Sequence, residues 1–184
     1  VKTFFMDLFP FWWKTFNPDG FRCDTAEWPS IWYKPTANKW FWGPIISNMR
    51  KYHPNMIFLA EGNWSRDAVD DMKSCGFDML YCSLTHCVGS CDVPFQDSIK
   101  NYKYGEAIGH AKDNAMMQSN DFLAYAYTFT HDDIKKDYTD PGLKAVAAAI
   151  GLFTFPVFGF WNGTNLALNN EDTPWFDTTS YPNY

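Results

Sequence analysis

Three acidic residues stand at the same kind of position, just past a short apolar run. Asp24, Glu61 and Asp132 each follow a segment of the type that forms a buried strand. Because the carboxyl ends of parallel strands meet at one edge of a sheet, we expect the three side chains to lie together. Paired carboxyl groups, one ionised and one protonated, are what retaining glycoside hydrolysis requires. For any one of these residues alone, a helix N-cap is the ordinary alternative.

The neighbours of the first two acids indicate different roles for them. Arg22 lies two residues before Asp24, so both side chains are expected on one face of a strand, where the guanidinium favours the ionised carboxylate of a nucleophile. Glu61 lies between the apolar stretch 58–60 and Trp64, a setting that is expected to raise its pKa and suit a general acid. The pair predicts carboxyl groups roughly 5–6 Å apart, the retaining separation.

Strands and helices are predicted to alternate along the chain. The predicted strands are Gly20–Cys23, Met56–Ala60, Phe77–Cys82, Phe122–Phe129 and Phe153–Phe158. The predicted helices are Asp7–Phe16, Lys39–Tyr52, Arg66–Ser74, Tyr104–Gln118 and Leu143–Leu152. This order is typical of βαβ units, and it predicts an α/β fold with a parallel sheet in one domain.

Composition excludes some partners and suggests another. The net charge of −6 argues against a nucleic-acid partner, and no apolar run approaches the ~20 residues of a membrane helix, so we expect neither nucleic acid nor membrane. Aromatic residues make up 20 %, with nine Trp. Burial is the usual reason for such rings, yet several, including Trp28 and Trp42, stand near Gly or Pro in loop-like stretches. Flat rings exposed in a cleft would suit the apolar faces of sugars.

A cysteine cluster offers a competing metal interpretation. Cys82, Cys87 and Cys91 stand close to His86, but their x4 and x3 spacings lack the paired C-x-x-C of zinc sites. Thiols in and around a strand are the favoured explanation. We therefore expect no metal site and no cofactor.

Four motifs together resemble the α-amylase superfamily. DGFRCDTAEW (Asp19–Trp28) resembles the segment that bears the nucleophile, and FLAEGNW (Phe58–Trp64) resembles the strand of the acid/base glutamate. FTHDD (Phe129–Asp133) resembles the segment of the third carboxylate, and GFD (Gly76–Asp78) matches the start of the family's sixth strand. Their order and spacing agree with that family over roughly residues 5–160.

The resemblance implies a role for each matching residue. Asp24 would be the nucleophile, Glu61 the acid/base, and Asp132 the residue that binds and distorts the sugar. Substrate contacts are implied for Arg22, which would also orient Asp24, and for His131, Trp28 and Trp64. Two departures concern detail: Thr130 replaces the usual Asn, and Trp28 stands where many amylases carry a His.

The resemblance also implies a partial (β/α)₈ TIM barrel comprising strands four to eight. Residues 1–184 would form the C-terminal half of an α-amylase-like catalytic barrel. Strands one to three are expected from a longer parent chain or from a second polypeptide, because five strands cannot close such a barrel. This N-terminal half is the expected protein partner, and an oligosaccharide or polysaccharide is the expected substrate.

Two functions remain open at this point. The first is a retaining glycoside hydrolase or transglycosylase acting on α-glucans, which the three carboxylates favour. The second is a non-catalytic barrel remnant that serves as a binding or partner subunit, which the absent half favours. The motifs leave open the sugar, the linkage and the cellular compartment.

Overall fold

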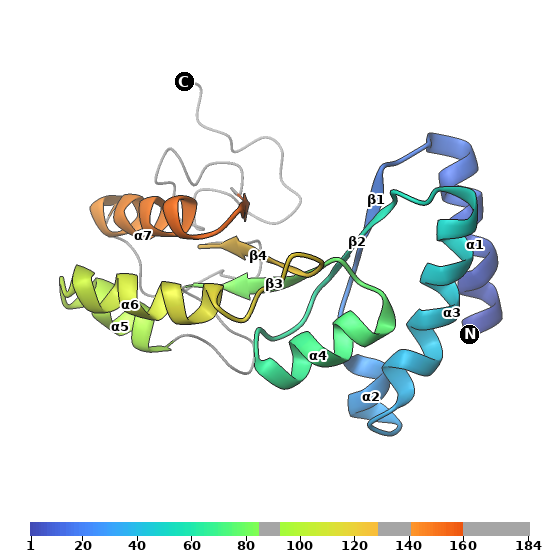
Figure 1. Cartoon of the computed structure of the whole chain (residues 1–184), viewed down its shortest axis with the longest axis horizontal. Helices are drawn as coiled ribbons and strands as arrows, with labels where there is room; N and C mark the ends of the chain where they lie inside the picture. Colours follow the sequence, from blue (N-terminus) through green and yellow to red (C-terminus); the bar gives the residue numbers. More distant parts are fainter. Residues whose placement is uncertain (85–92, 129–140, 160–184) are drawn as a thin grey trace, which may run out of the picture. The chain divides into compact units, whose positions relative to one another are not determined.

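The computed structural model describes residues 1–84, 93–128 and 141–159, over which strands and helices alternate (Figure 1). The strands are β1 (Gly20–Cys23), β2 (Ile57–Ala60), β3 (Met79–Ser83), β4 (Leu123–Tyr127) and β5 (Val157–Gly159). They form one sheet in the order β1-β2-β3-β4-β5. The pairs β1–β2, β2–β3 and β4–β5 are parallel, so the predicted α/β class with a parallel sheet is confirmed.

Seven helices are present in the described part of the chain. They are α1 (Lys2–Phe16), α2 (Trp28–Trp32), α3 (Ala37–Tyr52), α4 (Arg66–Cys75), α5 (Val93–Lys100), α6 (Tyr104–Ala115) and α7 (Pro141–Thr154). Sequence reasoning did not predict α2 and α5, which are short. It also placed Phe153 and Thr154 in the last strand. The structure corrects this, because α7 continues through Thr154 and the strand starts at Val157.

The chain divides into two compact units. The first comprises residues 1–81 and 117–124, and the second comprises 82–116 and 125–184. The segments around Asp24 and Glu61 both belong to the first unit. The candidate site described below lies entirely within the first unit.

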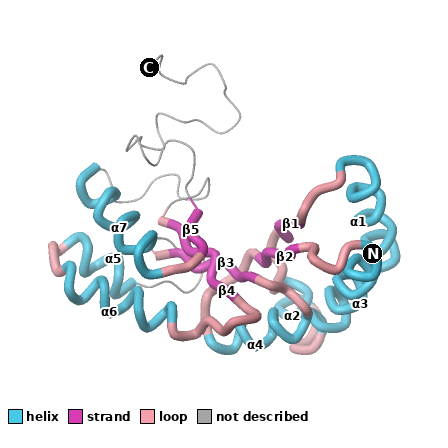
Figure 2. The backbone as a smooth tube through the Cα atoms, turned by 45° about the horizontal axis from the view of Figure 1, so that its top comes forward, coloured by secondary structure: helices cyan, strands magenta, loops and turns pink. Residues whose placement is uncertain are grey.

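Aromatic rings form much of the core of the first unit. Helices α1 and α3 pack side by side, as Figure 2 shows. Phe9 of α1 meets Phe21 of β1 with ring centroids 4.8 Å apart and Phe58 of β2 at 6.1 Å. Trp42 is 5 % exposed and lies in α3, so it belongs to the predicted helix 39–52, and the interpretation of its ring as lying in an exposed, loop-like stretch was wrong. Packing therefore explains a large share of the aromatic content.

The GFD motif (Gly76–Asp78) lies at the start of β2 and β3, at the end of the strands opposite to Asp24 and Glu61. Gly76 adopts a left-handed φ of 98°, which ends α4 and which a side chain would make strained. Two residues later, Asp78 accepts the Phe58 N–H at 2.7 Å and forms an ion pair with Arg50 at 2.6 Å. Asp78 thus joins the start of β2 to α3, away from the strand ends that carry Asp24 and Glu61.

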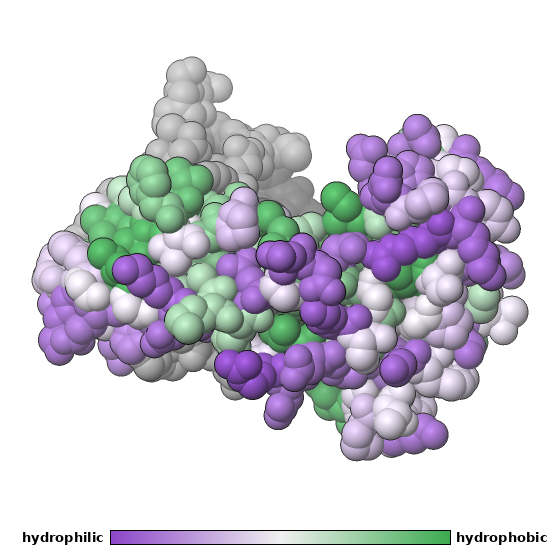
Figure 3. Space-filling view, viewed as in Figure 1, coloured by the Kyte–Doolittle hydropathy of each residue, from purple (hydrophilic) through white to green (hydrophobic). Residues whose placement is uncertain are grey.

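The sequence of helix α4 has the N-cap and the single apolar face that are typical of a surface helix. The Ser65 hydroxyl caps its first turn by accepting the Ala68 N–H at 3.3 Å. Val69, Met72 and Cys75 recur at helical spacing and are buried against the core. Hydrophilic side chains cover its other face (Figure 3).

The second unit contains a more apolar helix. Helix α7 buries Leu143 and Ala147, while Leu152 and Phe153 are 49 % and 89 % exposed. Apolar side chains gather over α7 in Figure 3. Within the described ranges, no helix combines the length and apolar character needed to cross a membrane.

Candidate functional site

The parallel register of β1 and β2 brings two of the predicted carboxylates together. Cys23 pairs with Ala60 at the ends of the two strands, so the next residues, Asp24 and Glu61, stand side by side. The Glu61 N–H continues the ladder by donating to the Cys23 carbonyl oxygen at 2.9 Å. Two residues that are 37 positions apart in sequence thus become neighbours at one edge of the sheet.

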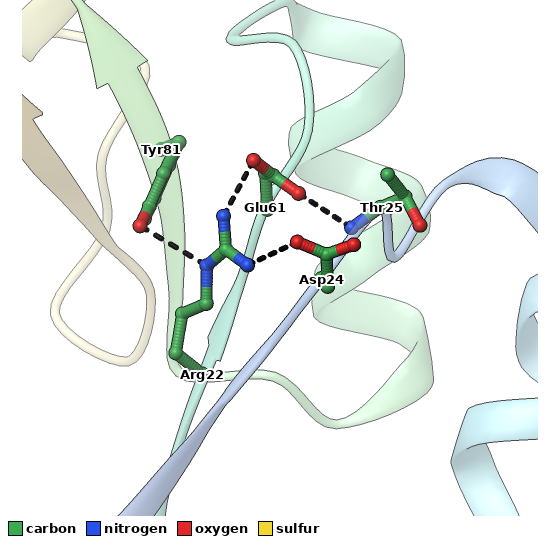
Figure 4. A network of polar contacts seen from close by, with 5 residues as sticks. All are labelled: Arg22, Asp24, Thr25, Glu61 and Tyr81. Atoms are coloured by element: carbon green, nitrogen blue, oxygen red, sulfur yellow. Dashed lines mark hydrogen bonds and ion pairs between the residues drawn. The ribbon is translucent and has the colours of Figure 1, made fainter. Parts of the chain in front are cut away.

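Both carboxyl groups bind the same guanidinium (Figure 4). Arg22 Nη1 pairs with Asp24 Oδ1, and Arg22 Nη2 pairs with Glu61 Oε1 at 2.5 Å. Arg22 Nε donates to the Tyr81 hydroxyl at 3.1 Å. Because a guanidinium is planar and rigid, it sets the two carboxyl groups relative to each other.

Solvent reaches the two carboxyl groups unequally. The Asp24 side chain is 72 % exposed, whereas the Glu61 side chain is 21 % exposed. Burial raises the pKa of Glu61, and the nearby Asp24 carboxylate raises it further. The Thr25 N–H and the Arg22 charge act in the opposite direction without cancelling the rise. The sequence-based expectation of a raised pKa for Glu61 is therefore confirmed.

The cation at the centre of the site stays charged. Burial lowers the pKa of Arg22, but hydrogen bonds to Tyr81 and Asp24 and the charge of Glu61 raise it above its ordinary value. Burial also raises the pKa of the adjacent Cys23 thiol to about 12. Cys23 is therefore a neutral thiol, and the site's chemistry rests with its carboxylates.

The backbone N–H of Thr25 binds the carboxyl group of Glu61. Thr25 has a left-handed φ of 45°, which is rare for a β-branched residue. In this conformation its N–H donates to Glu61 Oε2 at 2.6 Å. Strained backbone of this kind tends to occur at functional sites. Sequence reasoning missed both Thr25 and Tyr81, since neither residue type signals such a contact and the strand register is not readable from the chain.

The two predicted substrate-binding tryptophans have different surroundings. Trp28 begins α2, is 50 % exposed, and stacks on Trp32 with ring centroids 5.4 Å apart. Trp64 is partly buried against the core and lies nearly parallel to the Phe122 ring, at 12° and 6.4 Å. Packing accounts for Trp64, whereas Trp28 presents an open ring. A substrate contact by either ring stays a prediction.

Other predicted residues fall outside the described ranges. These are the predicted catalytic residue Asp132, the predicted substrate contact His131, and three members of the cysteine cluster, His86, Cys87 and Cys91. Cys82, the fourth member, is buried in β3. Within the part of the chain that is described, no three His, Cys, Asp or Glu residues are grouped to hold a metal ion.

Replacing Arg22 with methionine should shift the titration of Glu61, followed by carbon-13 NMR of its carboxyl group, to higher pH. Arg22 lowers the pKa of Glu61, so its removal raises that pKa further and keeps the proton on Glu61 to higher pH. Arg50→Met is the matched control, since it removes an ion pair of the same kind with Asp78. If both variants gave the same Glu61 titration, Arg22 would have no electrostatic role at Glu61.

Known proteins resemble this chain in structure. No protein-family model and no curated protein sequence matches it. Amy13B of Eubacterium rectale superposes with a TM-score of 0.67 at 16 % identity, covering 93 % of this chain and 35 % of its own. An Anoxybacillus α-amylase superposes with a TM-score of 0.58 at 19 % identity, covering 91 % of this chain and 36 % of its own. The chain has a glycoside hydrolase-like fold and spans about a third of the length of these proteins.

Proposed function

We propose that this chain carries the nucleophile and the acid/base of a retaining α-amylase-like glycosidase that acts on α-glucans. The observation that supports this most is the pairing of Asp24 and Glu61 on the guanidinium of Arg22. One carboxyl group is open to solvent, and the other is mostly buried with a raised pKa. This asymmetry is what a nucleophile and a proton donor need at one pH.

The proposed reaction has two steps. In the first, Asp24 Oδ attacks the anomeric carbon while the glycosidic oxygen leaves with the proton of Glu61, which gives a glycosyl ester on Asp24. In the second, ionised Glu61 takes a proton from an incoming hydroxyl, whose oxygen attacks the anomeric carbon and releases Asp24. Arg22 holds the two carboxyl groups in place through both steps. Asp132 and His131 would bind the hydroxyls of the cleaved sugar, and Trp28 and Trp64 would contact neighbouring sugars.

The incoming hydroxyl decides between the two possible outcomes. Water gives hydrolysis, and a sugar hydroxyl gives transglycosylation through the same glycosyl ester. Product analysis with and without an added oligosaccharide acceptor separates them. New, longer products would assign transglycosylation.

Trapping the glycosyl ester tests the proposal directly. In the assembly that completes the barrel, the fluorine of an activated 2-deoxy-2-fluoro-α-glycosyl donor slows both steps, while the activated leaving group restores the first. The intact mass of this chain should therefore rise by one sugar residue, and peptide mapping should place that residue on Asp24. Labelling at another residue, or turnover with inversion at the anomeric carbon, would contradict the proposal.

We further propose that residues 1–184 are the C-terminal half of an α-amylase-like barrel, strands four to eight, and that a second half completes it. Support comes from β1 and β5, which stand at the two ends of the described sheet, and from the length of the similar proteins. The chain alone should then lack α-glucosidic turnover, which should appear in a polypeptide or complex that supplies the other strands. A monomeric chain that is active alone would refute this.

A binding or partner subunit is the second candidate. The stacked pair Trp28 and Trp32 favours it, because exposed parallel indoles suit the apolar faces of sugars without any need for catalysis. Binding of a malto-oligosaccharide by calorimetry, with no turnover in the completed assembly, would support this candidate over the enzyme.

A further inference from the structure

The side chain of Glu27 points at the backbone that follows Glu61. Glu27 Oε1 accepts the Asn63 N–H at 2.9 Å, and Glu27 Oε2 accepts the Asn63 side-chain amide at 3.4 Å. A half-buried carboxylate therefore receives both donors of one residue in the segment 61–63. Charged acceptors make the stronger hydrogen bonds to backbone N–H groups.

Gly62 makes room for this contact. A Cβ at this position would lie 2.6 Å from both Cδ and Oε1 of Glu27, closer than atoms can approach. The φ of Gly62 is not in the left-handed region, so a side chain there would not strain the backbone but would require the Glu27 carboxyl group to move. The two residues thus fit each other: the carboxyl group of Glu27 fills the volume that a side chain at 62 would take.

Two further hydrogen bonds connect the segments 25–27 and 61–63 at Glu61 itself. The Ala26 N–H donates to the Glu61 carbonyl oxygen at 2.9 Å, and the Thr25 N–H donates to Glu61 Oε2 at 2.6 Å. Trp42 Nε1 in turn donates to the Ala26 carbonyl oxygen at 2.8 Å, which ties the segment 25–27 to buried α3. Glu27 extends this series of contacts past Glu61, so Glu61 is held on both sides.

From these contacts we propose that Glu27 is a positioning residue, which fixes the segment 61–63 and thereby the carboxyl group of Glu61. This inference rests on the proposed acid/base function of Glu61. Glu27 contacts Asn63, and it acts on Glu61 only through the segment that carries this proton donor.

The surroundings of Glu27 make its contribution to stability depend on pH. Burial raises the pKa of Glu27, the Asn63 N–H lowers it, and the charge of Asp71 raises it. The folded protein therefore holds the Glu27 proton to higher pH than the unfolded chain does. Stability must fall as pH rises from the unfolded pKa through the folded one.

Four variants test the proposal: Glu27→Gln, Glu27→Ala, Gly62→Ala, and Glu27→Ala combined with Gly62→Ala. Glu106→Gln is the control, since Glu106 is an exposed helical carboxylate that forms an ion pair with Lys103. Carbon-13 NMR of the glutamate carboxyl groups reports the titration of Glu61. Amide hydrogen exchange reports the protection of Asn63.

Glu27→Ala and Gly62→Ala should both speed exchange of the Asn63 amide by about tenfold, the effect of losing one hydrogen bond to a charged group. Both should also move the Glu61 titration toward the ordinary glutamate range, because a displaced segment is less buried. The double variant should show no more change than Glu27→Ala alone, since the added Cβ then meets no carboxyl group. Glu27→Gln retains one acceptor oxygen for the Asn63 N–H but loses the contact with the Asn63 side-chain amide. It should therefore lower kcat less than Glu27→Ala does, with KM unchanged.

The outcomes separate this inference from the proposed function. If the completed enzyme turns over and Glu27→Ala leaves the Glu61 titration and kcat as in the Glu106→Gln control, the positioning role is wrong and the function stands. If no turnover exists but the Glu61 titration still shifts, the function is wrong and the positioning of Glu61 stands. Should Glu27→Ala fail to fold, Glu27→Gln and Gly62→Ala decide by the same measurements.

Discussion

Asp24→Asn should reduce turnover on the order of 10⁴-fold or more in the assembly that completes the site, as loss of a nucleophile typically does. Asparagine has nearly the same shape, but its amide oxygen is a poor nucleophile and cannot form the glycosyl ester. Oligosaccharide affinity should change little, because Asp24 is largely exposed and its removal leaves Arg22 paired with Glu61. Steady-state kinetics and calorimetry measure the two effects separately.

Asp70→Asn is the matched control for this experiment. Asp70 is an exposed carboxylate on α4, and its replacement makes the same change of charge away from the site. Turnover by Asp24→Asn within a few fold of the Asp70→Asn control would exclude a covalent intermediate on Asp24.

Glu61→Gln should slow cleavage by roughly 10²–10⁴-fold when the leaving group is a sugar, because such a leaving group needs a proton. The rate of the glycosylation step should fall far less for substrates with an activated phenolate leaving group. Glutamine can still accept the Thr25 N–H, so the backbone at the site should stay in place.

The pH dependence gives an independent check on Glu61. Its raised pKa keeps the general acid protonated above the usual glutamate range, so activity should be lost as pH rises through that pKa. Glu61→Gln cannot ionise, and its residual activity should lack this alkaline limb. An unchanged limb in Glu61→Gln would assign the ionisation to another group.

Local sequence patterns were sufficient to predict most of the strands and helices of this chain. Continuous apolar runs such as Met56–Ala60 are stable only when buried on both faces, which indicates parallel strands. Cap and turn residues such as Ser65 and Gly76 mark where helix α4 begins and ends. Asp24 and Glu61 could be identified as candidate site residues because each follows a predicted strand. When strands are parallel, the residues that follow them lie at the same edge of the sheet.

Boundaries were harder to predict where local preferences conflict. Phe153 has a strand-like side chain, yet it continues α7, because helical hydrogen bonds carry on to the Phe155 N–H, which donates to Gly151. Trp42 stands near Gly43 and Pro44, which suggested an exposed ring, but its ring is buried in the core of the first unit. Tertiary burial overrides local propensity in such cases.

By itself, the sequence determined the strand-and-helix order, the strand ends that bear Asp24 and Glu61, and the direction of the Glu61 pKa. Only the tertiary structure decided that one guanidinium binds both carboxyl groups, and that Thr25 and Glu27 hold Glu61. These contacts depend on the register between β1 and β2 and on the backbone angles after each strand. Register is a property of two segments packed together, so neither segment alone contains it.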